Sequence, residues 1–148
     1  MIPTILRTTV AAFAFAFAFA FAFAGALALA TPSMAAMINF KASLDGKSEV
    51  PPNTTTGSGS LTATFDTESK KLTWKASANG LTGEATAAHF HGPASAGKNA
   101  GVMITIPSLE GSATLTDAQA KALMDGEMYV NVHTQAYKDG EIRGQLVK

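Results

Sequence analysis

The chain of 148 residues has three histidines, and their spacing favours a metal site. His89 and His91 lie one residue apart in the run Ala-Ala-His-Phe-His-Gly-Pro, and His133 lies in a later run, Tyr-Val-Asn-Val-His-Thr. On a β-strand, residues i and i+2 point to the same face, about 6.5–7 Å apart. Imidazole nitrogens bind Zn²⁺ or Cu²⁺ at about 2.0–2.1 Å, so two such side chains can converge on one ion. A histidine from a neighbouring strand would complete a site with three nitrogen ligands.

Three imidazoles with an open coordination position suit Cu(II) or Zn(II), and the affinity order favours copper where it is available. The chain has no cysteine, which excludes thiolate ligands, disulfides and cysteine nucleophiles. Met103 and Met128 can in principle offer a thioether to Cu(I), but methionines in alternating apolar patterns are more often core residues. The alternative for the histidine pair is structural, with one ring packed under the Gly92-Pro93 turn and the other donating to a backbone carbonyl.

Polar side chains near the third histidine predict how its ring is oriented. Asn131 shares a strand face with His133. If the last hairpin is symmetric, His133 lies opposite Glu141, and Asn131 lies opposite Arg143. Glu141 would then orient the imidazole of His133, as carboxylates beside metal ligands commonly do. The alternative is a cross-strand ion pair of Glu141 with Arg143 or Lys75.

Alternating apolar and polar residues predict the short strands that would position these side chains. We expect strands over 38–44, 61–66, 72–79, 84–91, 101–106, 112–115, 127–133 and 141–147. The link at 67–70 predicts a hairpin, and so does the turn dipeptide Asp139-Gly140. One helix over 118–124 is predicted by a capping-box pair, Thr116 and Gln119. Strands at this spacing favour an antiparallel β-sandwich or barrel.

The same alternation separates core positions from polar ones. Phe90 and Trp74 fall on apolar faces and are predicted to be core residues. In the strand over 127–133, the even-numbered residues would face the core, while Tyr129, Asn131 and His133 would form a polar face. The run Glu49-Val50-Pro51-Pro52 is predicted to fix an extended loop.

The first 36 residues are set apart from this fold. Arg7 is the only charged residue before Lys41, and it precedes an apolar run from Val10 to Ala30. Small residues and a proline follow, which predicts a signal peptide cleaved after about Ala30 to Ala36. The alternative is a retained anchor, because the run is long enough to span a bilayer. We expect export to the periplasm or the medium, with one domain over 37–148.

Charge limits the partners of that domain. It holds all 11 acidic residues and 10 of the 11 basic ones, so its net charge is −1. A nearly neutral chain without a basic cluster offers nucleic acid no electrostatic footprint. We therefore expect no nucleic-acid partner, and membrane contact only through an uncleaved signal segment.

Several sequence blocks together resemble those of the chordin-type (CHRD) domain family. They are Glu49-Val50-Pro51-Pro52, Leu81-Thr82-Gly83, Ala87-Ala88-His89-Phe90-His91-Gly92-Pro93-Ala94, Tyr129-Val130-Asn131-Val132-His133-Thr134 and Gly140-Glu141-Ile142-Arg143-Gly144-Gln145-Leu146. The blocks keep the family's order over about 40–146. The resemblance implies an extracytoplasmic, immunoglobulin-like β-sandwich, found as a single bacterial domain and as repeats in animal chordin. In chordin the context is the binding of secreted growth factors, which implies little about the activity of a single domain.

Three functions are in competition. The leading one is an exported domain that binds one Cu or Zn ion through His89, His91 and His133, for metal handling or for binding at the cell surface. The second is a structural or adhesive module that binds an extracellular or cell-surface protein without metal. The third is an enzyme, because the histidine pattern is similar to the copper site of copper-zinc superoxide dismutase. The chain lacks that enzyme's further ligands and its disulfide, and it has no nucleophile elbow or phosphate loop.

Overall fold

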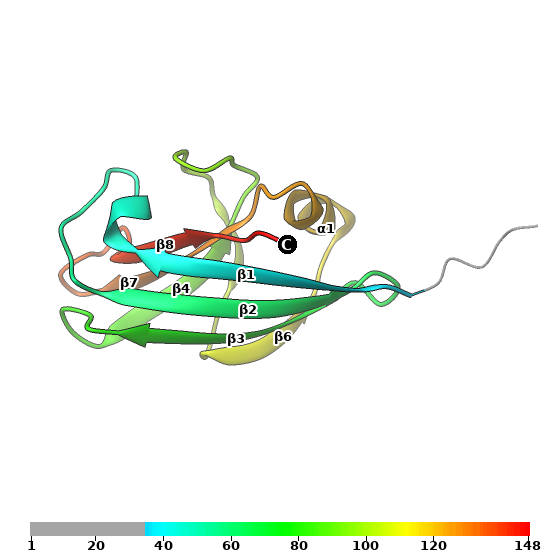
Figure 1. The fold of residues 1–148 in the computed structure, drawn as a ribbon, viewed down its shortest axis with the longest axis horizontal. Helices are drawn as coiled ribbons and strands as arrows, with labels where there is room; N and C mark the ends of the chain where they lie inside the picture. Colours follow the sequence, from blue (N-terminus) through cyan, green and yellow to red (C-terminus); the bar gives the residue numbers. More distant parts are fainter. Residues whose placement is uncertain (1–34) are drawn as a thin grey trace, which may run out of the picture. The chain divides into compact units, whose positions relative to one another are not determined.

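The computed structural model describes residues 35–148, which form one antiparallel eight-stranded sheet, one α-helix and a short 3₁₀ helix (Figure 1). The elements are β1 (Met37–Asp45), η1 (Gly46–Ser48), β2 (Ser58–Asp66), β3 (Lys71–Asn79), β4 (Ala85–His91), β5 (Val102–Thr105), β6 (Glu110–Thr114), α1 (Asp117–Met124), β7 (Tyr129–Thr134) and β8 (Ile142–Gln145). The predicted apolar run at 10–30 lies outside the described residues. Within 35–148, no helix is long and apolar enough to cross a membrane.

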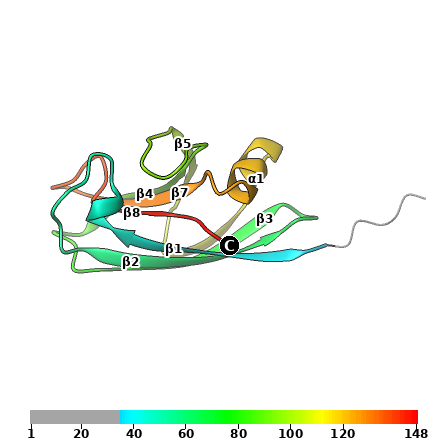
Figure 2. The same cartoon turned by 45° about the horizontal axis from the view of Figure 1, so that its top comes forward.

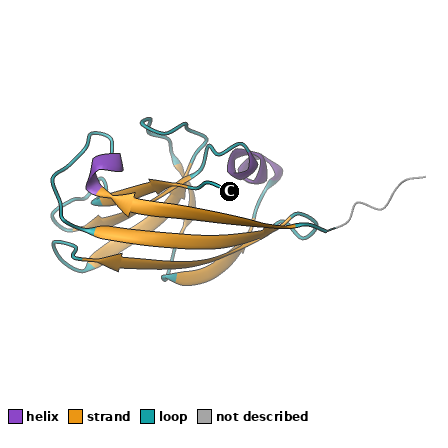
Figure 3. Cartoon of the chain, viewed as in Figure 1, coloured by secondary structure: helices purple, strands orange, loops and turns teal. Residues whose placement is uncertain are grey.

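The predicted all-β architecture with one short helix is confirmed. Each strand predicted from alternation is present, with ends that differ by a few residues. The capping box of α1 forms as expected, since the Thr116 hydroxyl accepts from the backbone of Gln119 and the Gln119 side chain accepts from the backbone of Thr116. The two helices lie at opposite ends of the strands (Figure 3).

The strands form one continuous sheet, in the order β5-β4-β7-β8-β1-β2-β3-β6, instead of the two sheets of an immunoglobulin-like sandwich. The sheet curls into a nearly closed barrel. Its two halves join at a narrow seam between β1 and β8, where Asp45 pairs with Arg143 and an isolated bridge joins Lys41 to Val147. Figure 2 shows β4, β7 and β8 above β1 and β2. The pairing of β1 with β8 therefore joins the two halves, which face each other, into one continuous sheet.

The core lies between the two halves of the sheet. Trp74 of β3 and Phe90 of β4 meet edge to face, with ring centroids 5.4 Å apart, and both are buried as predicted. Leu123 of α1 is fully buried and belongs to the same core. Burial of this apolar surface is the main term that stabilises the barrel.

The outer face of β7 is buried as well as its core face. All six residues of β7 are buried, including Tyr129, Asn131 and His133 of the face predicted to be polar. Two loops cover them: the loop over 92–101 contacts Tyr129 through Ala100, and the loop over 135–141 contacts His133 through Lys138. The loops therefore bury the polar face of β7, while His89 on the adjoining β4 stays partly exposed.

Candidate metal centre

The three histidines lie on neighbouring strands, on the outer face of the sheet. His89 and His91 project from β4, and His133 projects from β7, which pairs with β4. The register places Asn131 opposite His89 and Tyr129 opposite His91. One nitrogen from each imidazole lies within 4.8 Å of the other two. The strand period thus brings together the three residues that the sequence singled out, in a group that could hold a metal.

His89 and His133 form the tightest pair in this group. His89 Nδ1 lies 3.0 Å from His133 Nε2, and the ring centroids are 4.9 Å apart. The Nδ1–H of His133 donates to the carbonyl of Lys138 at 2.9 Å. Since a carbonyl only accepts, this bond leaves the Nε2 lone pair of a neutral His133 directed at His89. The two nitrogens are therefore close enough to share a proton or an ion.

His91 is held by three neighbours. Its ring stacks on Tyr129, with centroids 4.9 Å apart and planes 4° from parallel. Its Nδ1 donates to the carbonyl of Ala100 at 3.0 Å, and its Nε2 lies 3.0 Å from Oδ1 of Asn131. These contacts fix both the plane and the direction of the imidazole.

Arg143 supports this histidine through the tyrosine. Its guanidinium carbon lies 3.4 Å from the centre of the Tyr129 ring, a cation–π contact. In the sheet order β4-β7-β8, the tyrosine lies between His91 and Arg143. The guanidinium also donates to Asn99 and to the carbonyl of Lys98, which ties the covering loop to β8. A stack of three side chains thus crosses three strands.

Burial and neighbouring charge favour neutral imidazoles. Burial lowers the pKa of His89, and the other two histidines lower it further. Burial also lowers the pKa of His91; the hydrogen bonds to Ala100 and Asn131 oppose this effect, and the charges of His133 and Arg143 add to it. Neutral imidazole is the form that binds a metal, so these shifts reduce proton competition at neutral pH.

The expected supporting residues divide into two that adjoin the histidines and one that does not. Asn131 pairs with Arg143 across β7 and β8, as the hairpin symmetry predicted. Asn131 contacts His91, however, and the ring of His133 is oriented by the carbonyl of Lys138. Arg143 adjoins the site through Tyr129. The backbone carbonyl of Lys138 therefore orients His133, a role that the sequence prediction gave to the carboxylate of Glu141.

Glu141 is bound by threonines. It is fully buried, and its carboxylate accepts hydrogen bonds from the hydroxyls of Thr55, Thr82 and Thr134 and from the backbone N–H of Thr82. Burial alone would raise the pKa of Glu141, but these bonds outweigh it and hold the pKa below its usual value. Glu141 thus fastens the loop over 49–57 and the loop between β3 and β4, at Thr82, to the last hairpin.

Glu49 is a neighbour of the site that the sequence did not indicate. Its side chain is buried beside Asn131 and Arg143, and among the described residues its Oε1 has no hydrogen-bond partner of good geometry. Burial raises the pKa of Glu49 to about 7, although the charge of Arg143 opposes the rise. From the sequence, a glutamate just before two prolines is expected to lie exposed in a loop. Glu49 is buried because its loop packs against Gly140.

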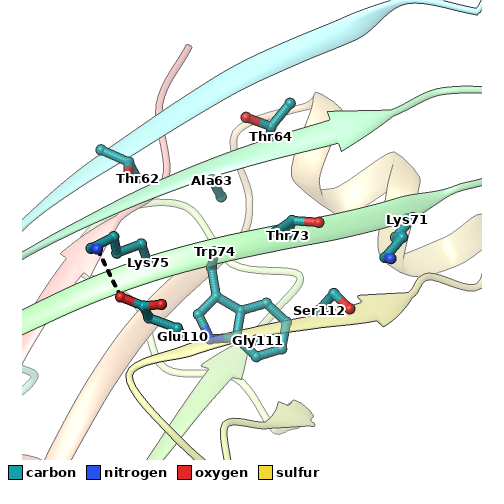
Figure 4. Close-up of a pocket in the computed structure, with 10 residues that line it drawn as sticks. All are labelled: Thr62, Ala63, Thr64, Lys71, Thr73, Trp74, Lys75, Glu110, Gly111 and Ser112. Carbon is teal, nitrogen blue, oxygen red and sulfur yellow. Dashed lines mark ion pairs between the residues drawn. The ribbon is translucent and has the colours of Figure 1, made fainter.

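Two other features of the described chain offer no comparable chemistry. Met128 is fully buried in the core and Met103 packs against it, as core residues do. A shallow cavity of about 560 Å³ lies over β2, β3 and β6, with threonines along its floor (Figure 4). Its one ion pair, Lys75 with Glu110 at 2.8 Å, is exposed and therefore weak. The histidine group is the stronger candidate because its donors converge.

Comparison with known families agrees with the blocks noted in the sequence. A family model described as the CHRD domain matches residues 40–146, which is nearly the whole of the described chain. Neither the search of curated proteins nor the search of solved structures gives a match.

Proposed function

We propose that this chain, which belongs to the CHRD domain family, is an exported protein whose domain over 37–148 binds one Cu(II) or Zn(II) ion. The ligands are His89, His91 and His133. The observation that carries the proposal is the convergence of three imidazole nitrogens within 4.8 Å on one face of two paired strands.

The nitrogen spacing supports metal binding. Two nitrogens bound to one ion at about 2.0–2.1 Å lie about 2.9 Å apart at a right angle and about 3.3 Å apart at a tetrahedral angle. The 3.0 Å between His89 Nδ1 and His133 Nε2 is already close to both values. An ion bound to both nitrogens lies to one side of the line that joins them, so each ring turns toward it while the nitrogen separation changes little.

The exposure of the site indicates metal handling more than a purely structural role. His91 is buried, whereas His89 is partly exposed and borders the small residues of β4. Three protein ligands leave at least one position for water or for a ligand of another molecule, as in open metal sites. Such a site can take up and release its ion, which suits metal handling or attachment at the cell surface.

Export is the second part of the proposal. The apolar run at 10–30 and the small residues after it support cleavage between Ala30 and Ala36. Intact-mass measurement of the protein recovered from the periplasm or the medium tests this point. We expect a mature chain that begins within residues 31–37; a full-length chain recovered with the membrane would support the anchor instead.

Calorimetric titration with Cu²⁺ and Zn²⁺ tests the metal site in the untagged domain. We expect one equivalent to bind to the natural sequence and none to bind specifically to the double variant His89→Ala/His91→Ala. Lys75→Ala is the matched control, because its side chain lies in the exposed cavity over β3. Failure of the natural domain to bind either ion would favour the structural or adhesive module.

A further inference from the structure

The contacts of His91 leave one nitrogen for a metal. Its Nδ1–H is committed to the carbonyl of Ala100, which also accepts from the hydroxyl of Tyr129. The stack with Tyr129 prevents the ring from tilting without the loss of that contact. Nε2 is therefore the atom that can bind an ion in this orientation.

The side chain of Asn131 covers that nitrogen. Asn131 Oδ1 lies 3.0 Å from His91 Nε2, and both side chains are buried. With Nδ1–H bound to Ala100, Nε2 of a neutral His91 is an acceptor, so it forms a hydrogen bond with Asn131 when the amide presents Nδ2–H to the ring. In either orientation the amide lies on the line along which a metal would approach. His89 and His133 differ in this respect, since the nitrogens that would bind the ion contact each other.

The other hydrogen bond of Asn131 is weak. Its Nδ2 donates to the carbonyl of Asp139 at 3.4 Å, at the long end of the range for such bonds. On that side the amide also packs against Gly140, where a Cβ atom would lie 2.8 Å from Nδ2. Besides His91, the amide is held by this long bond, by packing and by the neighbouring carboxyl of Glu49, so a competing ligand of His91 can displace it.

We propose that Asn131 is a positioning residue that holds His91 in the metal-free domain and competes with the metal for Nε2. This inference rests on the proposed function. An ion binds first between His89 and His133, and it gains His91 when the amide of Asn131 turns away. Asn131 therefore lowers the affinity of the site while it keeps the third ligand in place.

Competition titration against a chelator of known affinity tests this role with Cu²⁺ and Zn²⁺. We expect Asn131→Ala to bind both ions about 2- to 12-fold more tightly than the natural domain, from the net free energy of one neutral hydrogen bond. Asn39→Ala is the matched control, since this exposed amide lies on β1 and accepts a hydrogen bond from Thr64 of β2, away from the histidine strands. Its affinity should equal that of the natural domain.

Electron paramagnetic resonance of the Cu(II) complex provides a readout that a merely structural role would not give. If Asn131 competes with the metal for His91, the same three nitrogens coordinate Cu(II) in the natural domain and in Asn131→Ala, and the variant has the higher affinity. If the alanine variant does not fold by circular dichroism, Asn131→Ser takes its place, with the same expectation.

The outcomes separate the proposed role of Asn131 from the proposed metal site. If the natural domain binds metal and the Asn131 variant binds equally or more weakly, the role of Asn131 is wrong and the metal site stands. If both proteins bind metal and the variant binds more tightly, both are supported. If neither protein binds either ion, both are overturned.

Discussion

Replacing Glu49 by glutamine tests whether ionisation of this buried carboxyl, which lies beside the candidate site, destabilises the folded domain. We expect the carboxyl to be neutral in the folded domain at low pH and charged at high pH, where its charge lowers the free energy of unfolding. The structure raises the pKa of Glu49 from 4.5 to about 7, chiefly through burial. In the unfolded chain the same group titrates near 4.5. The folded state therefore holds its proton over a range in which the unfolded state releases it.

The sign and size of the effect follow from this difference. A folded-state pKa above the unfolded value destabilises the fold as pH rises. The penalty is absent below about pH 4.5, grows between pH 4.5 and 7, and is constant above pH 7. Its full size is about 3 kcal/mol, at about 1.4 kcal/mol for each pH unit between the two pKa values. Glutamine resembles the protonated carboxyl and removes the penalty.

Urea unfolding of the natural domain and of Glu49→Gln at pH 4 and pH 8 measures this quantity. We expect the variant to gain about 2–3 kcal/mol over the natural domain at pH 8 relative to pH 4. Any pH-independent change in packing cancels in that comparison. The exposed Glu110→Gln serves as the control and should change stability by less than about 1 kcal/mol at either pH. A difference between Glu49→Gln and the natural domain that is equal at the two pH values would refute the reasoning.

Three further results are expected. Glu141→Gln should lower the free energy of unfolding by about 2–3 kcal/mol at pH 7, because charge-assisted hydrogen bonds hold the pKa of Glu141 low. This loss should shrink as pH falls below about 4.5, which urea unfolding at pH 7 and pH 3 measures. Gly140→Ala should destabilise the domain by about 1–3 kcal/mol, because its backbone has a φ of +133° and a Cβ there would lie 2.3 Å from a carboxylate oxygen of Glu49. In the control Gly101→Ala the new Cβ has no atom within 4 Å, so thermal unfolding should change little. Because burial and neighbouring charge lower the pKa values of His89 and His91, metal affinity should fall mainly below pH 6.5; a fall already complete between pH 8 and 7 would contradict this.

The strands, the helix and the histidine group were predictable because they depend on local patterns. The two-residue period of a strand places His89 and His91 on one face, whatever the rest of the chain does. The symmetry of the last hairpin gives the pairing of Asn131 with Arg143, which the structure confirms. The seam of β1 with β8 joins segments almost 100 residues apart, and no local pattern indicates it.

The surroundings of the site were less predictable because they depend on how loops pack. The carbonyls of Ala100 and Lys138 hold two of the three imidazoles, and any residue type supplies a carbonyl. The burial of Glu49 arises only when its loop packs against the last hairpin. Glu141 was expected to face a histidine or a cation, but threonines distant in the sequence, such as Thr55, bind it. Side-chain chemistry alone does not reveal such partners.

The most direct test of the metal site is anomalous X-ray diffraction from crystals of the untagged domain loaded with one equivalent of Cu²⁺ or Zn²⁺. The account predicts a single strong anomalous peak between β4 and β7, about 2.0–2.1 Å from one nitrogen each of His89, His91 and His133. It also predicts that the amide of Asn131 has turned away from His91. A peak elsewhere on the domain, or no peak at the histidines under conditions that load the crystal, would contradict the account.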